Sequence, residues 1–91
     1  MSGIIVTPTG SRRFHVELRQ GEHHPRHYHV TVPVNLIDEL QLPENDLERV
    51  VQESFVFLLE REPASSIMAE FSLDVISRYF PEYKETLRER L

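Results

Sequence analysis

The chain contains no cysteine and no apolar stretch long enough to span a membrane. The lack of cysteine excludes disulfide bonds, thiolate metal sites and cysteine nucleophiles, and it fits a reducing compartment. The longest unbroken apolar run, Phe55 to Leu59, is far shorter than the ~20 residues that cross a bilayer. The first residues lack the basic start and the apolar segment of a signal peptide. We therefore expect a cytoplasmic protein without membrane contact.

Recognisable catalytic motifs are missing as well. The chain has no glycine-rich phosphate loop and no Gly-x-Ser-x-Gly nucleophile elbow. Pairs of histidine and glutamate do occur, such as Glu22 with His23 and His15 with Glu17, but such neighbours are expected by chance beside a loop. We therefore expect no enzymatic activity and no cofactor.

The composition is that of one small globular domain with an uneven charge distribution. Of the 91 residues, 40% are apolar and 27% charged, which is too apolar for a disordered chain. Residues 1–34 carry a formal charge of +2 and all five histidines, whereas residues 35–91 carry −7, which together give the net charge of −5. We expect this asymmetry to give the protein surface a basic side and an acidic side, or to support a contact between chains.

Alternating apolar residues predict strands in the first third of the chain. Phe14, Val16 and Leu18 alternate with polar residues, and so do Tyr28, Val30 and Val32 after a turn near residues 20–25. Two such runs around a loop containing glycine and proline predict an antiparallel hairpin. The short run of residues 4–6 extends this hairpin to a three-stranded meander.

The rest of the chain reads as helices. We expect helices over Val34–Leu40 and from Glu44 or Asn45 to about Arg61, followed by shorter ones. Ser65 or Ser66 begins one that carries Ile67, Met68 and Phe71; Ser72 begins another with Val75, Ile76, Tyr79 and Phe80; and Pro81 begins the last, with Tyr83, Leu87 and Leu91. The predicted fold is α+β, with an antiparallel β-hairpin or three-stranded meander followed by three to five helices. Residues 1–91 form a single domain, with a β-ribbon over 1–33 and a helical part over 34–91.

The long helix is apolar around most of its circumference. Val56 and Phe57 widen the inward stripe, so the helix is buried on several sides, either centrally in the fold or in a dimer. Aromatic residues also gather around Pro81 and would make a docking surface. The predicted interface residues are Phe55, Phe57, Leu58, Tyr79, Phe80 and Tyr83. We expect a homodimer, with an unidentified protein partner as a further possibility.

Four histidines, His23, His24, His27 and His29, fall within seven residues. A hairpin that turns near residue 23 places Glu17 opposite His29, Arg19 opposite His27 and His15 opposite Thr31. Glu17, His27 and His29 then share one face, which is one hypothesis for a divalent metal site. An exposed polar face with a histidine-rich loop explains the same residues, and so does a patch whose charge changes with pH.

The order of elements from His27 to Arg61 resembles the strand–helix–helix order of ribbon-helix-helix regulators. This resemblance implies a dimer whose paired strands enter the major groove of DNA, as in transcription regulators and antitoxins. It implies DNA-binding roles for Arg26, His27, His29 and Thr31. Acidic residues at the start of the second helix, Glu44, Asp46 and Glu48, would repel the DNA backbone, so nucleic-acid binding is not favoured.

The second half of the chain, from Phe55 to Tyr83, is similar to small uncharacterised bacterial proteins, and this similarity implies no activity. The leading hypothesis is a non-enzymatic, dimeric protein-interaction module. The alternatives are a DNA-binding regulator or antitoxin and a divalent-metal-binding protein.

Overall fold

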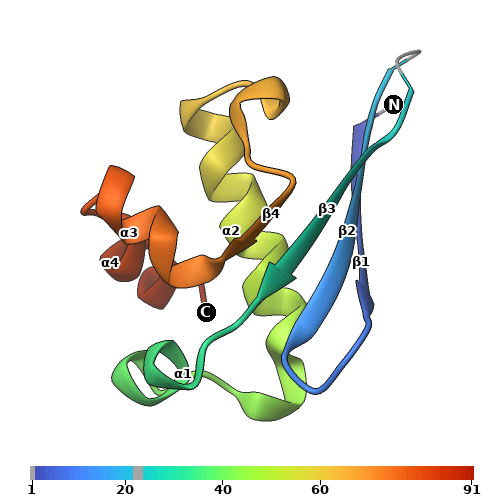
Figure 1. Ribbon diagram of the computed structural model, residues 1–91. Helices are drawn as coiled ribbons and strands as arrows, with labels where there is room; N and C mark the ends of the chain where they lie inside the picture. Colours follow the sequence, from blue (N-terminus) through green and yellow to red (C-terminus); the bar gives the residue numbers. More distant parts are fainter. Residues whose placement is uncertain (1, 22–23) are drawn as a thin grey trace.

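The computed structural model describes residues 2–21 and 24–91, which form a mixed sheet with helices packed against one of its faces (Figure 1). The sheet has four strands in spatial order β1-β2-β3-β4. They are β1 (Ser2–Pro8), β2 (Arg13–Gln20), β3 (Arg26–Thr31) and β4 (Glu70–Ser72). The first three strands form an antiparallel meander, whereas β4 is parallel to β3.

The helical part contains four α-helices within the described residues. They are α1 (Val34–Leu40), α2 (Leu47–Arg61), α3 (Ile76–Tyr79) and α4 (Tyr83–Arg90), with short 3-10 helices η1 (Glu44–Asp46), η2 (Ala64–Ser66) and η3 (Leu73–Val75). This arrangement confirms the predicted α+β class, a three-stranded meander followed by three to five helices. No helix in the described part of the chain has both the length and the apolar character needed to cross a membrane.

The alternation of apolar residues in β2 and β3 places one face of the sheet, here called the inner face, in the core. Its five residues in these strands are at most 4% exposed: Phe14, Val16, Leu18, Tyr28 and Val30. Successive strand residues point to opposite faces, so the residues between them form the outer face. The described helices lie on the inner side, and the outer face is left uncovered by them (Figure 1).

Helix α2 occupies the centre of the molecule, between the sheet and the pair α3 and α4 (Figure 1). On its sheet side, the ring of Phe55 packs against Tyr28 at a centroid distance of 5.2 Å. On the other side, the ring of Phe57 lies 5.2 Å from that of Tyr83. The wide apolar surface of this helix is therefore covered by the chain's own elements. Its burial is explained by its central place in the fold and does not need a dimer.

Three buried hydroxyl groups form hydrogen bonds within the core. Ser54 donates a hydrogen bond to the backbone oxygen of Val50 at 2.7 Å, and its Oγ lies 2.7 Å from the hydroxyl of Tyr83. Because the serine proton is already used, the tyrosine is the donor in the second bond. The hydroxyl of Tyr28 donates to the backbone oxygen of Ala64 at 2.8 Å. Burial raises the pKa of both Tyr83 and Tyr28 above the ordinary tyrosine value.

The helix predicted from Ser65 or Ser66 to Phe71 is wrong. The chain forms the short η2 there and then extends into β4, in which Phe71 pairs with Val30. The backbone N–H of His29 also donates to the oxygen of Ala69 at 2.7 Å. Pairing with the sheet edge satisfies the backbone groups that a helix would otherwise have satisfied, so tertiary structure overrides local preference here.

The helices near the C-terminus also differ in their limits from the prediction. Helix α3 is one turn long, and η3 precedes it where a single helix from Ser72 was expected. Helix α4 begins at Tyr83 and not at Pro81. The inward residues predicted for it are nevertheless placed as expected, since Tyr83 and Leu87 are both buried.

Candidate functional site

The six residues predicted to form an interface separate into two groups. Phe55, Phe57, Leu58 and Tyr83 are each at most 3% exposed and belong to the chain's own core. These four therefore cannot form a surface in the folded chain, because intramolecular packing already covers them. Tyr79 is 70% exposed and Phe80 is half-buried, so only this end of the predicted surface is accessible.

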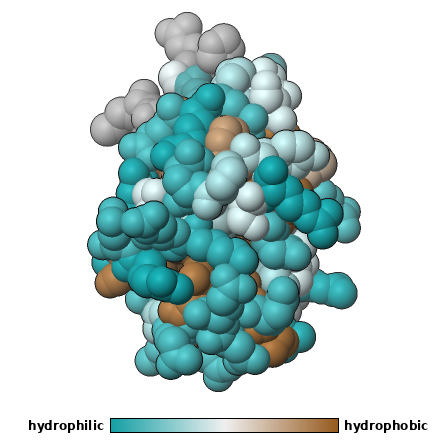
Figure 2. Space-filling model, turned by 90° about the vertical axis from the view of Figure 1, so that its left-hand side faces the viewer, coloured by the Kyte–Doolittle hydropathy of each residue, from teal (hydrophilic) through white to brown (hydrophobic). Residues whose placement is uncertain are grey.

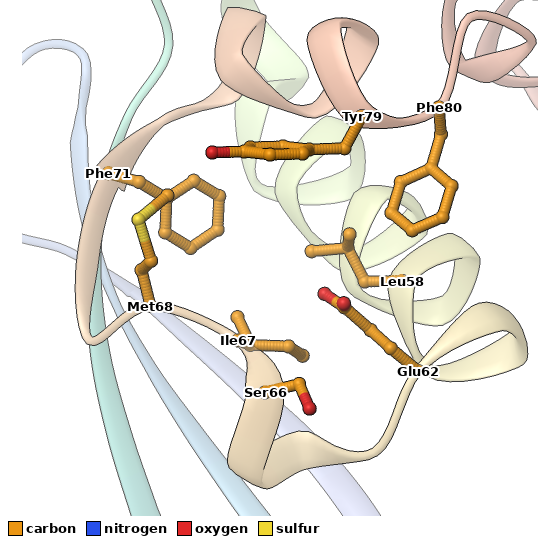
Figure 3. A pocket seen from close by; sticks show the side chains of 8 residues that line it. All are labelled: Leu58, Glu62, Ser66, Ile67, Met68, Phe71, Tyr79 and Phe80. Atoms are coloured by element: carbon orange, nitrogen blue, oxygen red, sulfur yellow. The ribbon is translucent and has the colours of Figure 1, made fainter.

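The accessible aromatic residues border a pocket of about 480 Å³. Three parts of the chain build it: the end of α2, the segment from η2 to β4, and α3 with the residue that follows it (Figure 3). The lining side chains are Leu58, Glu62, Ser66, Ile67, Met68, Phe71, Tyr79 and Phe80, and we call this site the aromatic pocket. Its size lies within the range of ~300–1,000 Å³ that is usual for ligand sites.

The aromatic pocket leaves two large side chains exposed to solvent. Met68 is 47% exposed and Tyr79 70%, while Leu58 and Ile67 form a buried floor. The rings of Phe71 and Phe80 are half-buried at its walls. The face of the molecule seen from the side of α3 and α4 is mostly hydrophilic, with hydrophobic residues in small separate patches (Figure 2).

One carboxylate lies among these apolar side chains. Glu62 is half-buried, and its carboxylate points toward the middle of the ring of side chains (Figure 3). Within the described part of the chain, no side chain pairs with it in an ion pair or hydrogen bond. The neighbouring cation is turned elsewhere, because the guanidinium of Arg61 lies 3.6 Å from the centroid of the Phe57 ring and donates to the Phe57 backbone oxygen.

Part of the aromatic pocket was missed by sequence reasoning. Ile67 and Met68 were assigned to a helix, so their place beside Tyr79 was not foreseen. The available signal was Glu62-Pro63, which ends α2 and turns the chain back across it. Glu62 and Ser66 carry no functional signal in the sequence, since polar residues in a segment next to a proline are typical of loops.

The outer face of the sheet brings the histidines together in a register that differs from the predicted one. Glu17 pairs with His27, His15 with His29, and Arg13 with Thr31. The predicted pairs were displaced by two residues, because alternation fixes which face a residue occupies but not its partner along the strand. His24 is exposed before β3, and the predicted loop residues Glu22 and His23 lie outside the described residues.

The histidine rings form a contact network across β2 and β3. The Nε2 atom of His15 lies 3.0 Å from Nδ1 of His27, and the two rings are stacked with centroids 5.1 Å apart. The ring of His29 lies 5.3 Å from that of His15. A hydrogen bond between two imidazole nitrogens needs one donor and one acceptor, so the contact requires that at least one of the two rings be neutral.

The predicted metal ligands do not converge. In the range 2–21 and 24–91, no group of three or more histidine, aspartate or glutamate side chains is arranged to hold a metal ion. Glu17 is instead paired with Arg19, whose hydrogen bond lowers the pKa of that glutamate. The structure therefore gives no support to a site made of Glu17, His27 and His29.

The predicted DNA-binding residues lie on β3, which is an internal strand. Arg26, His27 and His29 are exposed and Thr31 is half-buried. The strand pairs with β2 along its length and with β4 over residues 29–31. In a ribbon-helix-helix dimer the corresponding strand pairs with a second chain, so the two arrangements differ in this respect.

No protein-family model, no curated protein and no solved structure matches this chain.

Proposed function

We propose that the chain is a non-enzymatic protein-interaction module that binds a segment of another protein in the aromatic pocket. The observation that carries this proposal is the exposure of Tyr79 and Met68, which both line a concave apolar site. Interface energy is concentrated in aromatic side chains that enter or border such pockets. Methionine adapts its shape to different partners, so the pair suits recognition of a protein segment.

The charge around the aromatic pocket indicates which partner fits. Of the eight side chains that line it, one is charged, the carboxylate of Glu62, and none is basic. A partner segment with apolar side chains next to lysine or arginine would meet both the apolar walls and this carboxylate. A second copy of this chain fits less well, because the net charge of −5 makes two copies repel one another.

The predicted homodimer has lost one of the observations that favoured it. The apolar surface of α2 no longer requires a second chain, because the chain's own elements cover it. Self-association could only use the accessible residues, chiefly Tyr79 and Met68. Light scattering at high protein concentration separates the two cases, since a pocket that is free for another protein predicts a monomer and self-association through Tyr79 and Met68 predicts a dimer.

A peptide selection tests the proposal without a known partner. A random peptide library displayed on phage is selected on the immobilised protein, and the enriched peptides are measured by calorimetry. We expect peptides in which apolar residues adjoin lysine or arginine. Tyr79→Asp should weaken their binding at least tenfold, because it removes the exposed aromatic side chain that borders the aromatic pocket.

The matched control is Val34→Asp, which puts the same charge on another exposed apolar residue, 48% exposed on α1. Both variants are compared with the unmodified protein by circular dichroism, which shows whether the fold is kept. Selected peptides that bind equally to the protein and to Tyr79→Asp would overturn the proposal. A dimer that Tyr79→Asp dissociates would also overturn it, by making a second copy the occupant.

A further inference from the structure

The aromatic pocket combines three aromatic rings with one inward carboxylate. Phe71, Tyr79 and Phe80 line one side of the pocket, and the carboxylate of Glu62 points toward its middle from the other side, next to Leu58 (Figure 3). We infer that this pocket is a binding site for an organic cation, namely the ammonium group of a lysine side chain presented by the partner. The inference rests on the proposed function and specifies the chemistry of the group that enters the pocket.

Aromatic rings attract cations through the negative potential of their faces. This attraction is strongest where water is excluded, and the half-buried rings of Phe71 and Phe80 provide such a place. Tyr79 lies across the rim opposite the floor made by Leu58 and Ile67 (Figure 3). Aromatic side chains alone would bind a neutral apolar group equally well. The carboxylate of Glu62 is therefore the feature that favours a positively charged ligand.

The carboxylate of Glu62 makes a neutral ligand unfavourable. An apolar group that fills the aromatic pocket would remove water from this carboxylate and leave it without a hydrogen-bond donor. Among the residues described, no cation is placed to compensate for that loss, since Arg61 is engaged by Phe57 and by Glu60. A lysine ammonium supplies both the charge and the donors.

The lysine stem fits the remaining walls. Its four methylene groups form an apolar stem with the charge at the tip, and the apolar lining of Leu58, Ile67 and Met68 suits such a stem. The protein uses the same type of contact next to the pocket, where Arg61 covers the ring of Phe57. The ring of Phe57 in turn packs edge-to-face on that of Phe80, with centroids 5.9 Å apart.

A pair of small molecules tests the charge alone. n-Butylammonium and 1-butanol have the same number of heavy atoms, and only the first is charged. Each is titrated into the full-length protein, with the carbon-13-labelled methyl group of Met68 observed by NMR. We expect the methyl signal to shift with n-butylammonium and 1-butanol to bind at least about fivefold more weakly, as a partly desolvated cation–aromatic contact requires.

Variants assign the effect to the aromatic pocket. Glu62→Gln should remove most of the preference for n-butylammonium, and Tyr79→Ala should weaken its binding. The control is Glu70→Gln, which removes an exposed carboxylate outside the aromatic pocket. Equal loss in Glu70→Gln would show that overall charge is responsible and would overturn the inference.

The two proposals fail in different ways. If 1-butanol binds as well as n-butylammonium, or if neither shifts the Met68 signal, the cation site is refuted. Peptide binding that still depends on Tyr79 would then keep the interaction module in place. If the selected peptides ignore Tyr79→Asp, the proposed function fails whichever small molecule binds.

Discussion

The two faces of the meander carry neighbouring residues under opposite constraints. On the inner face, Val16 and Leu18 are fully buried, whereas Glu17 between them faces solvent beside His27. The inner residues are held by contacts with α2 and the rest of the core, so their size and polarity are restricted. The outer residues are held only by their cross-strand neighbours. The comparison teaches that sequence pattern reports burial well and says little about the arrangement of exposed side chains.

Substitution of a large inner residue should give the largest effect. Leu18→Ala should lower the free energy of unfolding by about 2–5 kcal/mol, because it removes buried methyl groups and leaves a cavity. His27→Ala on the outer face should change it by less than about 0.5 kcal/mol. Urea unfolding followed by circular dichroism measures both. Similar values for the two variants would show that the faces are not constrained differently.

The buried hydroxyl pair gives the next largest effect. Ser54→Ala should cost about 1–3 kcal/mol, because it leaves the hydroxyl of Tyr83 buried without an acceptor. Tyr83→Phe should cost less, since Ser54 keeps its bond to the Val50 oxygen. The double variant should be more stable than the sum of the two losses implies, as a double-mutant cycle measures. Simple additivity would contradict the assigned bond.

Alkaline pH should distinguish the buried tyrosines from exposed ones. Burial raises the pKa of Tyr83 above the ordinary value of 10.0, so the unfolded chain loses this proton while the folded chain keeps it. The stabilisation is present below pH 10 and is lost as pH rises beyond it, with a slope of about 1.4 kcal/mol per pH unit for one tyrosine. Tyr83→Phe should make the decline shallower in unfolding experiments between neutral and alkaline pH. An unchanged slope would contradict this assignment.

The smallest effect is expected from Glu17 on the outer face. The hydrogen bond from Arg19 lowers the pKa of this half-buried carboxylate below its ordinary 4.5. Its contribution is therefore present above that pH and is lost as the pH falls through the lowered pKa. Glu17→Gln should differ slightly from the unmodified protein at pH 7 and not at all once the carboxylate is protonated. Thermal melting over this pH range measures the difference, and a difference that persists in acid would exclude the pair as its cause.

The meander and the long helix could be predicted from the sequence because burial of one face makes apolar residues recur at a regular spacing in each. Phe14, Val16 and Leu18 alternate as a half-buried strand must, and residues 47–61 follow the helical period. Strand β4 could not be predicted in this way, since its three residues contain too little of any period. Its position depends on pairing with β3, which is distant in sequence.

The candidate site was predicted only in part for a related reason. Tyr79 and Phe80 were identified from their type and spacing, and both border the aromatic pocket. Phe55 and Tyr83 have the same chemistry but are buried, because helix spacing does not say how many neighbours cover a helix. The histidine register was displaced by two residues, since a shift of two keeps every side chain on its face.

The parallel strand β4 also determines when the aromatic pocket exists during folding. Its pairing with β3 joins parts of the chain that are distant in sequence, and such contacts form late because a long loop must first close. Met68 and Phe71 lie next to or within this strand, so they reach the end of α2 only when the last third of the chain has returned to the sheet. A nascent chain that still lacks that segment therefore has no aromatic pocket, and the proposed binding of a partner requires that the segment has first returned to the sheet.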